Sequence, residues 1–318
     1  MTLRTIRGLH GALGPIAMCF VVALAVAGSV RATGQTYSSG QPVWPAFEGW
    51  EKNDDGSFSF VFGYMNDNWL EEFDVPIGPE NSIEPGGPDR GQPTHFQPRR
   101  NRFVFRVRVP KDWGDKEMVW TLATRGTARK AYASLRTDLL LENIDIMSET
   151  GALGPGSSNP EIRADKPPAI AIVGGKALTA KAGQPLTLTA IVTDDGIPRR
   201  RGGQQGPPPG RGGQDTPSFR PPPSRPTVGK NLGLHLAWFV YRGAGAVSFE
   251  PLQVKTWEDT RAGANSPWAP FWTPPPVPAE GKYVVTATFA EPGTYVLRAR
   301  ADDGALTSDE DVTVTVSR

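Results

Sequence analysis

Two short acidic motifs carry side chains that could bind a metal ion. The motif Asp-Asp-Gly occurs at residues 194–196 and again at 302–304. Carboxylate oxygens are the ligands that Ca²⁺ takes in proteins. We therefore predict a calcium site on four carboxylates, those of Asp194, Asp195, Asp302 and Asp303. An alternative stays open, because Asp-Asp-Gly is also ordinary turn chemistry.

An aromatic segment between the two motifs is a candidate binding surface. Residues 256–279 are rich in tryptophan and proline. Large aromatic side chains dominate the contact energy of many protein interfaces. The predicted contact residues are Trp257, Trp268, Phe271 and Trp272. The same rings could instead shield the open end of a β-sandwich.

No pattern typical of catalysis is recognisable. Outside the first 32 residues the histidines are His95 and His235, and neither has a second ligand at helical spacing. A Gly-x-Ser-x-Gly nucleophile motif and a phosphate-binding Gly-x-x-x-x-Gly-Lys motif are both absent from the sequence. We therefore expect no enzyme, no catalytic residue and no organic cofactor.

A carbohydrate-binding or glycan-active module is the alternative function. Many glycan-cleaving enzymes use a pair of carboxyl groups, and Glu71, Glu72 and Asp74 closely follow Trp69. A solvated strand edge would have the same composition. The two interpretations differ in geometry, because an enzyme needs two carboxyl groups that face each other across one cleft, at about 5–9.5 Å.

The first 32 residues are typical of an export signal. Arg4 and Arg7 precede an uncharged apolar run at 16–26, which is followed by small residues suited to cleavage. The run is shorter than the roughly 20 residues of a membrane span, although a retained anchor remains the alternative. Cys19, the single cysteine, lies in this run. We expect a cleaved signal peptide, a periplasmic or extracellular location, and no membrane contact beyond the signal.

Charge gives little indication of the partner. Lys and Arg total 34 and Asp and Glu total 33, which leaves a net charge of +1. Residues 197–230 form a Pro/Gly/Arg-rich stretch with Arg-Gly-Gly at Arg201 and at Arg211. Such a composition predicts disorder. We expect no nucleic-acid partner for an exported chain, and weak attraction to anionic envelope polymers is the alternative.

Short alternating segments indicate an all-β fold of two β-sandwich units. Aromatic residues occupy every second position of 57–64, and 102–109 alternates in the same way. We predict a signal peptide at 1–32, disorder at 33–45, a first sandwich at 46–148, a Gly/Ser/Pro linker at 149–167 and a second sandwich at 168–318. Its strands are expected at 169–173, 186–192, 232–241, 247–255, 282–289, 295–301 and 312–316.

The second unit resembles a bacterial PKD-type (polycystic-kidney-disease) immunoglobulin-like domain. The residues that carry this resemblance are Trp238, the stretches 243–249, 287–289 and 292–297, the motif 301–304 and the closing strand 312–316. The resemblance, together with the place of Trp238 in a central strand, predicts that this side chain is buried between the two sheets. The resemblance implies an immunoglobulin-like sandwich that serves as a spacer or as an adhesion or binding module. The first unit resembles uncharacterised secreted bacterial proteins, and this implies no activity.

Together these observations predict a non-catalytic binding or scaffold protein of the cell envelope or the extracellular space. Its partner would be an envelope protein or a polysaccharide. Fold alone does not decide between these two classes, because immunoglobulin-like sandwiches serve many functions.

Overall fold

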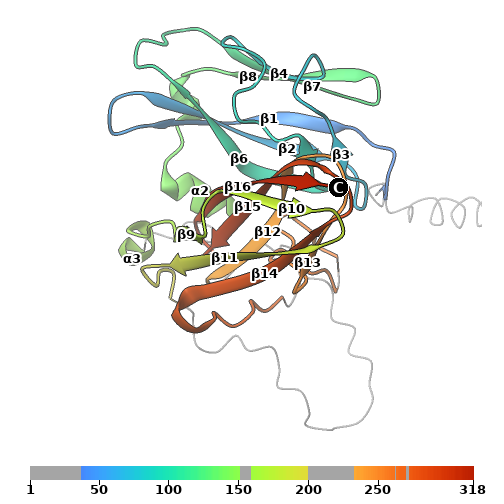
Figure 1. Cartoon of the computed structure of the whole chain (residues 1–318). Helices are drawn as coiled ribbons and strands as arrows, with labels where there is room; N and C mark the ends of the chain where they lie inside the picture. The colour runs from blue at the N-terminus through green and yellow to red at the C-terminus, as the bar shows by residue number, and fades with distance from the viewer. Residues whose placement is uncertain (1–36, 151–158, 200–232, 262, 270–271) are drawn as a thin grey trace, which may run out of the picture. The chain divides into compact units, whose positions relative to one another are not determined.

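The computed structural model describes residues 37–150, 159–199, 233–261, 263–269 and 272–318 (Figure 1). The predicted signal peptide and nearly all of the predicted disordered insert lie outside these ranges. Residues 37–318 form one compact unit. No helix among the described residues is long and apolar enough to cross a membrane.

The fold is all-β, as predicted, and the first half of the unit is a sandwich of two three-stranded antiparallel sheets. One sheet has the order β1-β2-β6 and the other β4-β7-β8. The strands of this half are β1 (Val43–Lys52), β2 (Phe58–Asn66), β3 (Phe73–Asp74), β4 (Asn81–Glu84), β5 (His95–Phe96), β6 (Arg99–Val109), β7 (Met118–Thr124) and β8 (Thr127–Ala133).

Aromatic side chains from both sheets fill the core of this sandwich. Phe62 of β2 lies 5.2 Å from Phe105 of β6 and 5.9 Å from Trp120 of β7, measured between ring centroids. The period-2 pattern explains why Phe60 and Phe62 share this face. Val61 points the other way and is also buried, so both faces of β2 are covered.

Two predicted boundaries of the first half need correction. Residues 43–45 were expected to be disordered, but they begin β1, in which Val43 pairs with Asn66 and Trp44 with Met65 of β2. Backbone pairing with a neighbouring strand orders this stretch in spite of Pro45. The predicted linker contains the end of helix α2 (Asn143–Thr150) and the short helix α3 (Pro160–Arg163).

The second half is a sandwich with the strand arrangement of an immunoglobulin-like domain. Its sheets have the orders β13-β14-β11-β9 and β10-β16-β15-β12, and β10 runs parallel to β16. This split of seven or more strands over two sheets is that of the immunoglobulin fold. The strands are β9 (Ala169–Val173), β10 (Ala177–Lys181), β11 (Pro185–Thr193), β12 (His235–Arg242), β13 (Val247–Glu250), β14 (Lys282–Phe289), β15 (Gly293–Asp302) and β16 (Thr307–Ser317).

Trp238 lies in the core between these two sheets. Its side chain is 1% exposed and packs among residues of both sheets, including Leu188, Phe289 and Leu297. The prediction that Trp238 is buried is therefore confirmed. Strand β13 ends at Glu250, earlier than expected, because the chain turns at the following Pro251.

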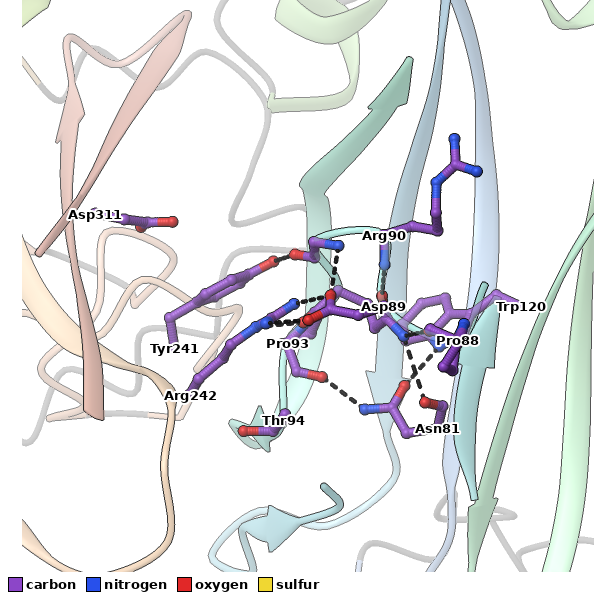
Figure 2. A network of polar contacts seen from close by, with 12 residues as sticks. Asn81, Pro88, Asp89, Arg90, Pro93, Thr94, Trp120, Tyr241, Arg242 and Asp311 are labelled. Atoms are coloured by element: carbon purple, nitrogen blue, oxygen red, sulfur yellow. Dashed lines mark hydrogen bonds and ion pairs between the residues drawn. The ribbon is translucent and has the colours of Figure 1, made fainter. Parts of the chain in front are cut away.

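A buried amide holds the long loop between β4 and β6 in place. Asn81 accepts a hydrogen bond from the indole Nε1 of Trp120 at 3.0 Å and donates to the carbonyl oxygens of Val75 and Pro93 at 2.9 and 2.8 Å. Figure 2 shows how this network reaches Asp89. The loop has a defined conformation although it contains few apolar residues.

This ordered loop contacts strand β12 of the second sandwich. The guanidinium of Arg242 donates to both carboxylate oxygens of Asp89 at 3.0 and 2.8 Å, and Tyr241 donates to the carbonyl oxygen of Gly91 (Figure 2). The two sandwiches therefore share a junction built from polar contacts as well as apolar ones.

Arg298 of β15 is a buried charge at this junction. It is 7% exposed, donates to both carboxylate oxygens of Asp311 at 2.7 and 2.8 Å, and donates to the carbonyl oxygen of Val104 in β6 at 2.6 Å. Its guanidinium lies 3.5 Å from the centroid of the Tyr241 ring. One side chain thus joins strands of both sandwiches.

Candidate functional site

The end of the second sandwich where β11 and β15 finish brings the two Asp-Asp-Gly motifs together. Asp194 follows the last residue of β11, and Asp302 is the last residue of β15. Asp302 pairs across the ladder with His235, the first residue of β12. Asp194 and Asp303 line the same open hollow, together with Gly196, Pro198, Gly233, Leu234, Pro276 and Val277.

Each of the four predicted aspartates caps its own turn. Asp194 Oδ2 accepts the amide of Gly196 at 2.9 Å, and Asp195 Oδ1 accepts that of Ile197 at 2.9 Å. In the second motif Asp302 Oδ1 accepts the amide of Gly304 at 2.7 Å. Asp303 Oδ1 accepts the amides of Ala305 and Leu306 at 2.6 and 2.8 Å. Turn chemistry therefore accounts for one oxygen of each carboxylate.

The second oxygen of two of these carboxylates is buried without a partner. Neither Asp194 Oδ1 nor Asp303 Oδ2 has a hydrogen-bond partner among the described residues. Asp195 is exposed, whereas Asp302 lies 4.0 Å from the Nε2 of His235. The predicted set of four therefore divides into two pairs with different surroundings.

Asp165 joins this cluster and was not predicted from the sequence. It is 3% exposed, and neither of its carboxylate oxygens has a hydrogen-bond partner among the described residues. Ala169 in β9 pairs with Thr193 in β11, so the residues just before β9 lie beside the residues just after β11. Antiparallel pairing of the two predicted strands 169–173 and 186–192 would have indicated that the residues just before the first lie beside the end of the second.

Burial and mutual repulsion raise the pKa values of three of these carboxyl groups. Burial, together with the charges of Asp195 and Asp194, raises the pKa of Asp165 to about 7. Burial also raises the pKa of Asp303 to about 8, against the opposing effect of two backbone amides. The pKa of Asp194 is raised by burial as well. No ion pair among the described residues offsets the charges of Asp165, Asp194 or Asp303.

The side chains alone do not form a closed metal site. Among the described residues, no group of three or more His, Cys, Asp or Glu side chains is already arranged to hold a metal ion. Any cation here would need ligands besides these carboxylates.

The predicted aromatic contacts do not form one surface. Trp272 is half-buried, and its ring lies 5.1 Å from that of His235. Trp268 is also half-buried and lines a small cleft with His235 and Asp302. Trp257 is 5% exposed and lies 6.5 Å from Trp69 of the first sandwich, which gives it a structural role. Phe271 lies outside the described residues.

The small cleft beside Trp268 is lined by residues of both sandwiches. Its charged residues are largely paired within the chain: Arg100 with Glu48 at 2.6 Å and Arg102 with Glu258 at 3.0 Å. The basic lining therefore offers little uncompensated charge to an anionic ligand.

The acidic residues proposed for a glycan site are bound to basic ones. Glu71 accepts hydrogen bonds from Arg125 and from the amide of Gly40. Glu72 and Asp74 both lie against His95, at 3.3 and 2.9 Å.

Trp69, which precedes these acidic residues in the chain, is covered by two arginine side chains. The guanidinium groups of Arg99 and Arg261 lie 4.4 and 4.8 Å from the centroid of the Trp69 ring. This indole is thus already stacked within the chain, in an arrangement that stabilises the protein rather than leaving a platform for a sugar.

Comparison with known proteins shows no family for this chain. No protein-family model matches it, and no curated protein matches it in sequence. The PKD-type resemblance is therefore not confirmed, and the immunoglobulin-like assignment depends on the strand order described above.

Several solved structures are weakly similar to this chain. A chimeric titin Z1Z2 carrying a decorin peptide is 9% identical and covers 86% of this chain and 97% of its own, with a TM-score of 0.22. The D00-D0 domain of intimin is 11% identical, and the match covers 87% of this chain and 100% of the intimin domain, with a TM-score of 0.23. Domains 4 and 5 of the S-layer protein SbsC are 9% identical, and the match covers 87% of this chain and 98% of the SbsC chain, with a TM-score of 0.22. Values this low carry no argument about function.

Proposed function

We propose that this chain is a non-catalytic binding or scaffold protein, exported to the cell envelope or the extracellular space. The observation that carries the proposal is the junction between the two sandwiches. Arg298 is buried there and bonded to both halves, and Arg242 is paired with Asp89. A scaffold needs this property, because it must hold its surfaces in a constant relative position.

The residues that could have supported catalysis are engaged in structural contacts. His95 is held between Glu72 and Asp74, and Nδ1 of His235 lies 3.0 Å from the carbonyl oxygen of Gly233. These contacts favour a binding role over the glycan-active alternative. The proposed contact surface is the end of the second sandwich that carries Trp268 and Trp272, and the proposed partner is an envelope protein or polysaccharide.

A binding experiment tests this function directly. The chain without its signal is incubated separately with purified peptidoglycan, with envelope polysaccharide and with detergent-solubilised envelope proteins. We expect retention by one of these materials and loss of retention in the double variant Trp268→Ala/Trp272→Ala. Trp44→Ala is the matched control, because Trp44 is 46% exposed and belongs to β1.

Two outcomes would contradict the proposal. Retention by none of the three materials would remove the binding role. Release of soluble sugar fragments from peptidoglycan or polysaccharide, detected by mass spectrometry, would show that the chain is an enzyme. Circular dichroism of the double variant checks that its sandwich is intact, because Trp272 also contacts His235.

A further inference from the structure

We propose that the second sandwich binds a divalent cation, with Ca²⁺ as the preferred ion, on the carboxylates of Asp165, Asp194 and Asp303. This inference goes beyond the proposed function and does not depend on it. It also differs from the site predicted from sequence, because Asp165 enters the set while Asp195 and Asp302 leave it.

Four buried carboxylate oxygens that have no hydrogen-bond partner among the described residues carry the inference. They are Asp165 Oδ1, Asp165 Oδ2, Asp194 Oδ1 and Asp303 Oδ2. Asp165 is 3% exposed and Asp303 is 2% exposed, so solvent does not replace the missing partners. A buried polar atom without a partner destabilises the fold, and a buried charged group does so more strongly. Such atoms usually indicate a bound water or ion.

The backbone brings the three carboxyl groups to one place. The amide of Lys166 donates to Asp195 Oδ2 at 3.3 Å, so the segment that carries Asp165 lies against the first motif. Asp194 and Asp303 line one hollow. The hydroxyl of Ser308, which follows the second motif, donates to the carbonyl oxygen of Pro168, so the segment that carries Asp165 also lies beside the second motif.

The turns also orient these groups. Asp194 and Asp303 each use one carboxylate oxygen for backbone amides of their own turn, and this leaves the other oxygen free. A carboxylate fixed by such hydrogen bonds is already oriented before the cation arrives, as is typical of ligands supported by a second layer of contacts.

The chemistry of the donors selects the ion. All the free donors are carboxylate oxygens, which suit Ca²⁺ or Mg²⁺ rather than metals that prefer nitrogen or sulfur. Ca²⁺ takes six to eight oxygens in flexible geometry, and water or backbone carbonyls often supply several of them. Asp194 and Asp303 line an open hollow that leaves room for such additional ligands, so the three side chains need not complete the coordination by themselves.

The test is a cation titration of the chain without its signal, after dialysis against EDTA. Thermal unfolding is measured with EDTA, with CaCl₂ and with MgCl₂, and calorimetry measures the heat of binding. We expect Ca²⁺ at about 100 times its dissociation constant to raise the melting temperature by roughly 5–10 °C. Mg²⁺ should have a smaller effect.

Isosteric variants connect the effect to the three residues. Asp165→Asn and Asp303→Asn should abolish the Ca²⁺-dependent rise. In EDTA each variant should melt at or above the wild-type temperature, because it removes a buried carboxyl group that repels its neighbours whenever it is ionised. Asp54→Asn is the matched control, since Asp54 lies in an exposed turn of the first sandwich; it should respond to Ca²⁺ as the wild type does. If either variant does not fold, Asp194→Asn replaces it, because Asp194 is only partly buried.

A negative result is equally clear. If neither cation changes the melting temperature or gives heat, while Asp165→Asn is stabilised in EDTA, the three carboxylates share protons only and the proposal is overturned. A Ca²⁺ response that persists unchanged in both Asp165→Asn and Asp303→Asn would also overturn it. Failure of the envelope-binding experiment affects neither outcome, because that experiment is independent of the cation.

Discussion

Individual side chains in this protein combine local and long-range roles. Asp303 caps the turn after β15 with one oxygen and leaves the other buried. Trp238 fills the space between two sheets, yet its buried indole Nε1 has no hydrogen-bond partner in the part of the chain that the structure describes. Its contribution to stability must therefore come from packing.

The first prediction at this scale concerns Trp238. Replacement by alanine leaves a large cavity among Leu188, Phe289 and Leu297, so Trp238→Ala should lower the free energy of unfolding by about 3–5 kcal/mol. Denaturant unfolding followed by circular dichroism measures this loss. Trp44→Ala, at an exposed position, should cost far less. A loss below about 1 kcal/mol for Trp238→Ala would contradict its place in the core.

The second prediction concerns His95 and pH. Burial opposes protonation of this ring, but hydrogen bonds to Asp74 and Glu72 outweigh burial and raise its pKa to about 9. The unfolded ring has a pKa near 6.5. The proton therefore stabilises the fold fully below about pH 6.5, and this contribution is lost as the pH rises through about 9.

His95→Gln isolates this effect. Between pH 6.5 and 9 the wild type should lose on the order of 1 kcal/mol more stability than the variant, a modest value because Glu72 and Asp74 are partly exposed. Loss of protons from Asp165 and Asp303 also lowers the stability as the pH rises. Only the difference in stability change between the wild type and His95→Gln therefore reports on His95. Urea unfolding of both proteins at the two pH values measures this difference. An equal loss of stability in the wild type and in His95→Gln would contradict the ion pairs of His95.

At the scale of elements, the close approach of neighbouring strands and turns restricts which residues fit. The turn that leads into β14 contains Gly281, whose φ is +63°. A Cβ at this position would lie 2.2 Å from the carbonyl oxygen of Val192 in β11. Only glycine allows this turn to approach β11 so closely.

Gly281→Ala should therefore destabilise the second sandwich. The methyl group combines an unfavourable φ with a clash against backbone, so we expect a loss of about 2 kcal/mol or more. Gly263→Ala is a control for φ alone, because Gly263 has a φ of +75° with nothing within 4 Å of its Cβ position. Equal losses in thermal unfolding of the two variants would show that the clash is relieved by small movements.

At the scale of the whole unit, the junction makes one body from two sandwiches. Tyr241 of β12 packs with the core of the first sandwich. A second small cluster joins Val61 and Phe103 to Met147 of α2 and to Leu306. Apolar and polar contacts thus reinforce each other across the junction.

We predict that calorimetry of the wild type shows one cooperative transition that includes both sandwiches. Arg298→Ala should lower the stability by about 1–3 kcal/mol, because it removes the buried guanidinium that donates to Asp311 and to the carbonyl oxygen of Val104, while Asp311 is partly exposed and can be solvated. It should also separate the transition into two. Arg106→Ala is the control, since Arg106 is exposed and pairs with Glu51 inside the first sandwich; it should cost about 1 kcal/mol or less. Two transitions in the wild type would contradict a firm junction.

The sequence by itself determined the local features of this protein. Alternation of apolar and polar residues located β2, β6, β11 and β14 to within a few residues, because strand periodicity is a local property. The buried position of Trp238 and the turns at the two Asp-Asp-Gly motifs were also predictable from neighbouring residues. The edge strand β1 was not predicted, and the first sandwich was expected to begin only at residue 46, because the order of β1 comes from its pairing with β2.

Only the tertiary structure decided which distant residues meet. Asp165 is 138 positions before Asp303 in the chain, yet pairing of β9 with β11 brings it to the same end of the sandwich. The contact of Arg298 with Val104, and the burial of Trp257 against the first sandwich, arise in the same way. Such contacts depend on how strands pair and sheets pack, and periodicity along the chain does not contain that information.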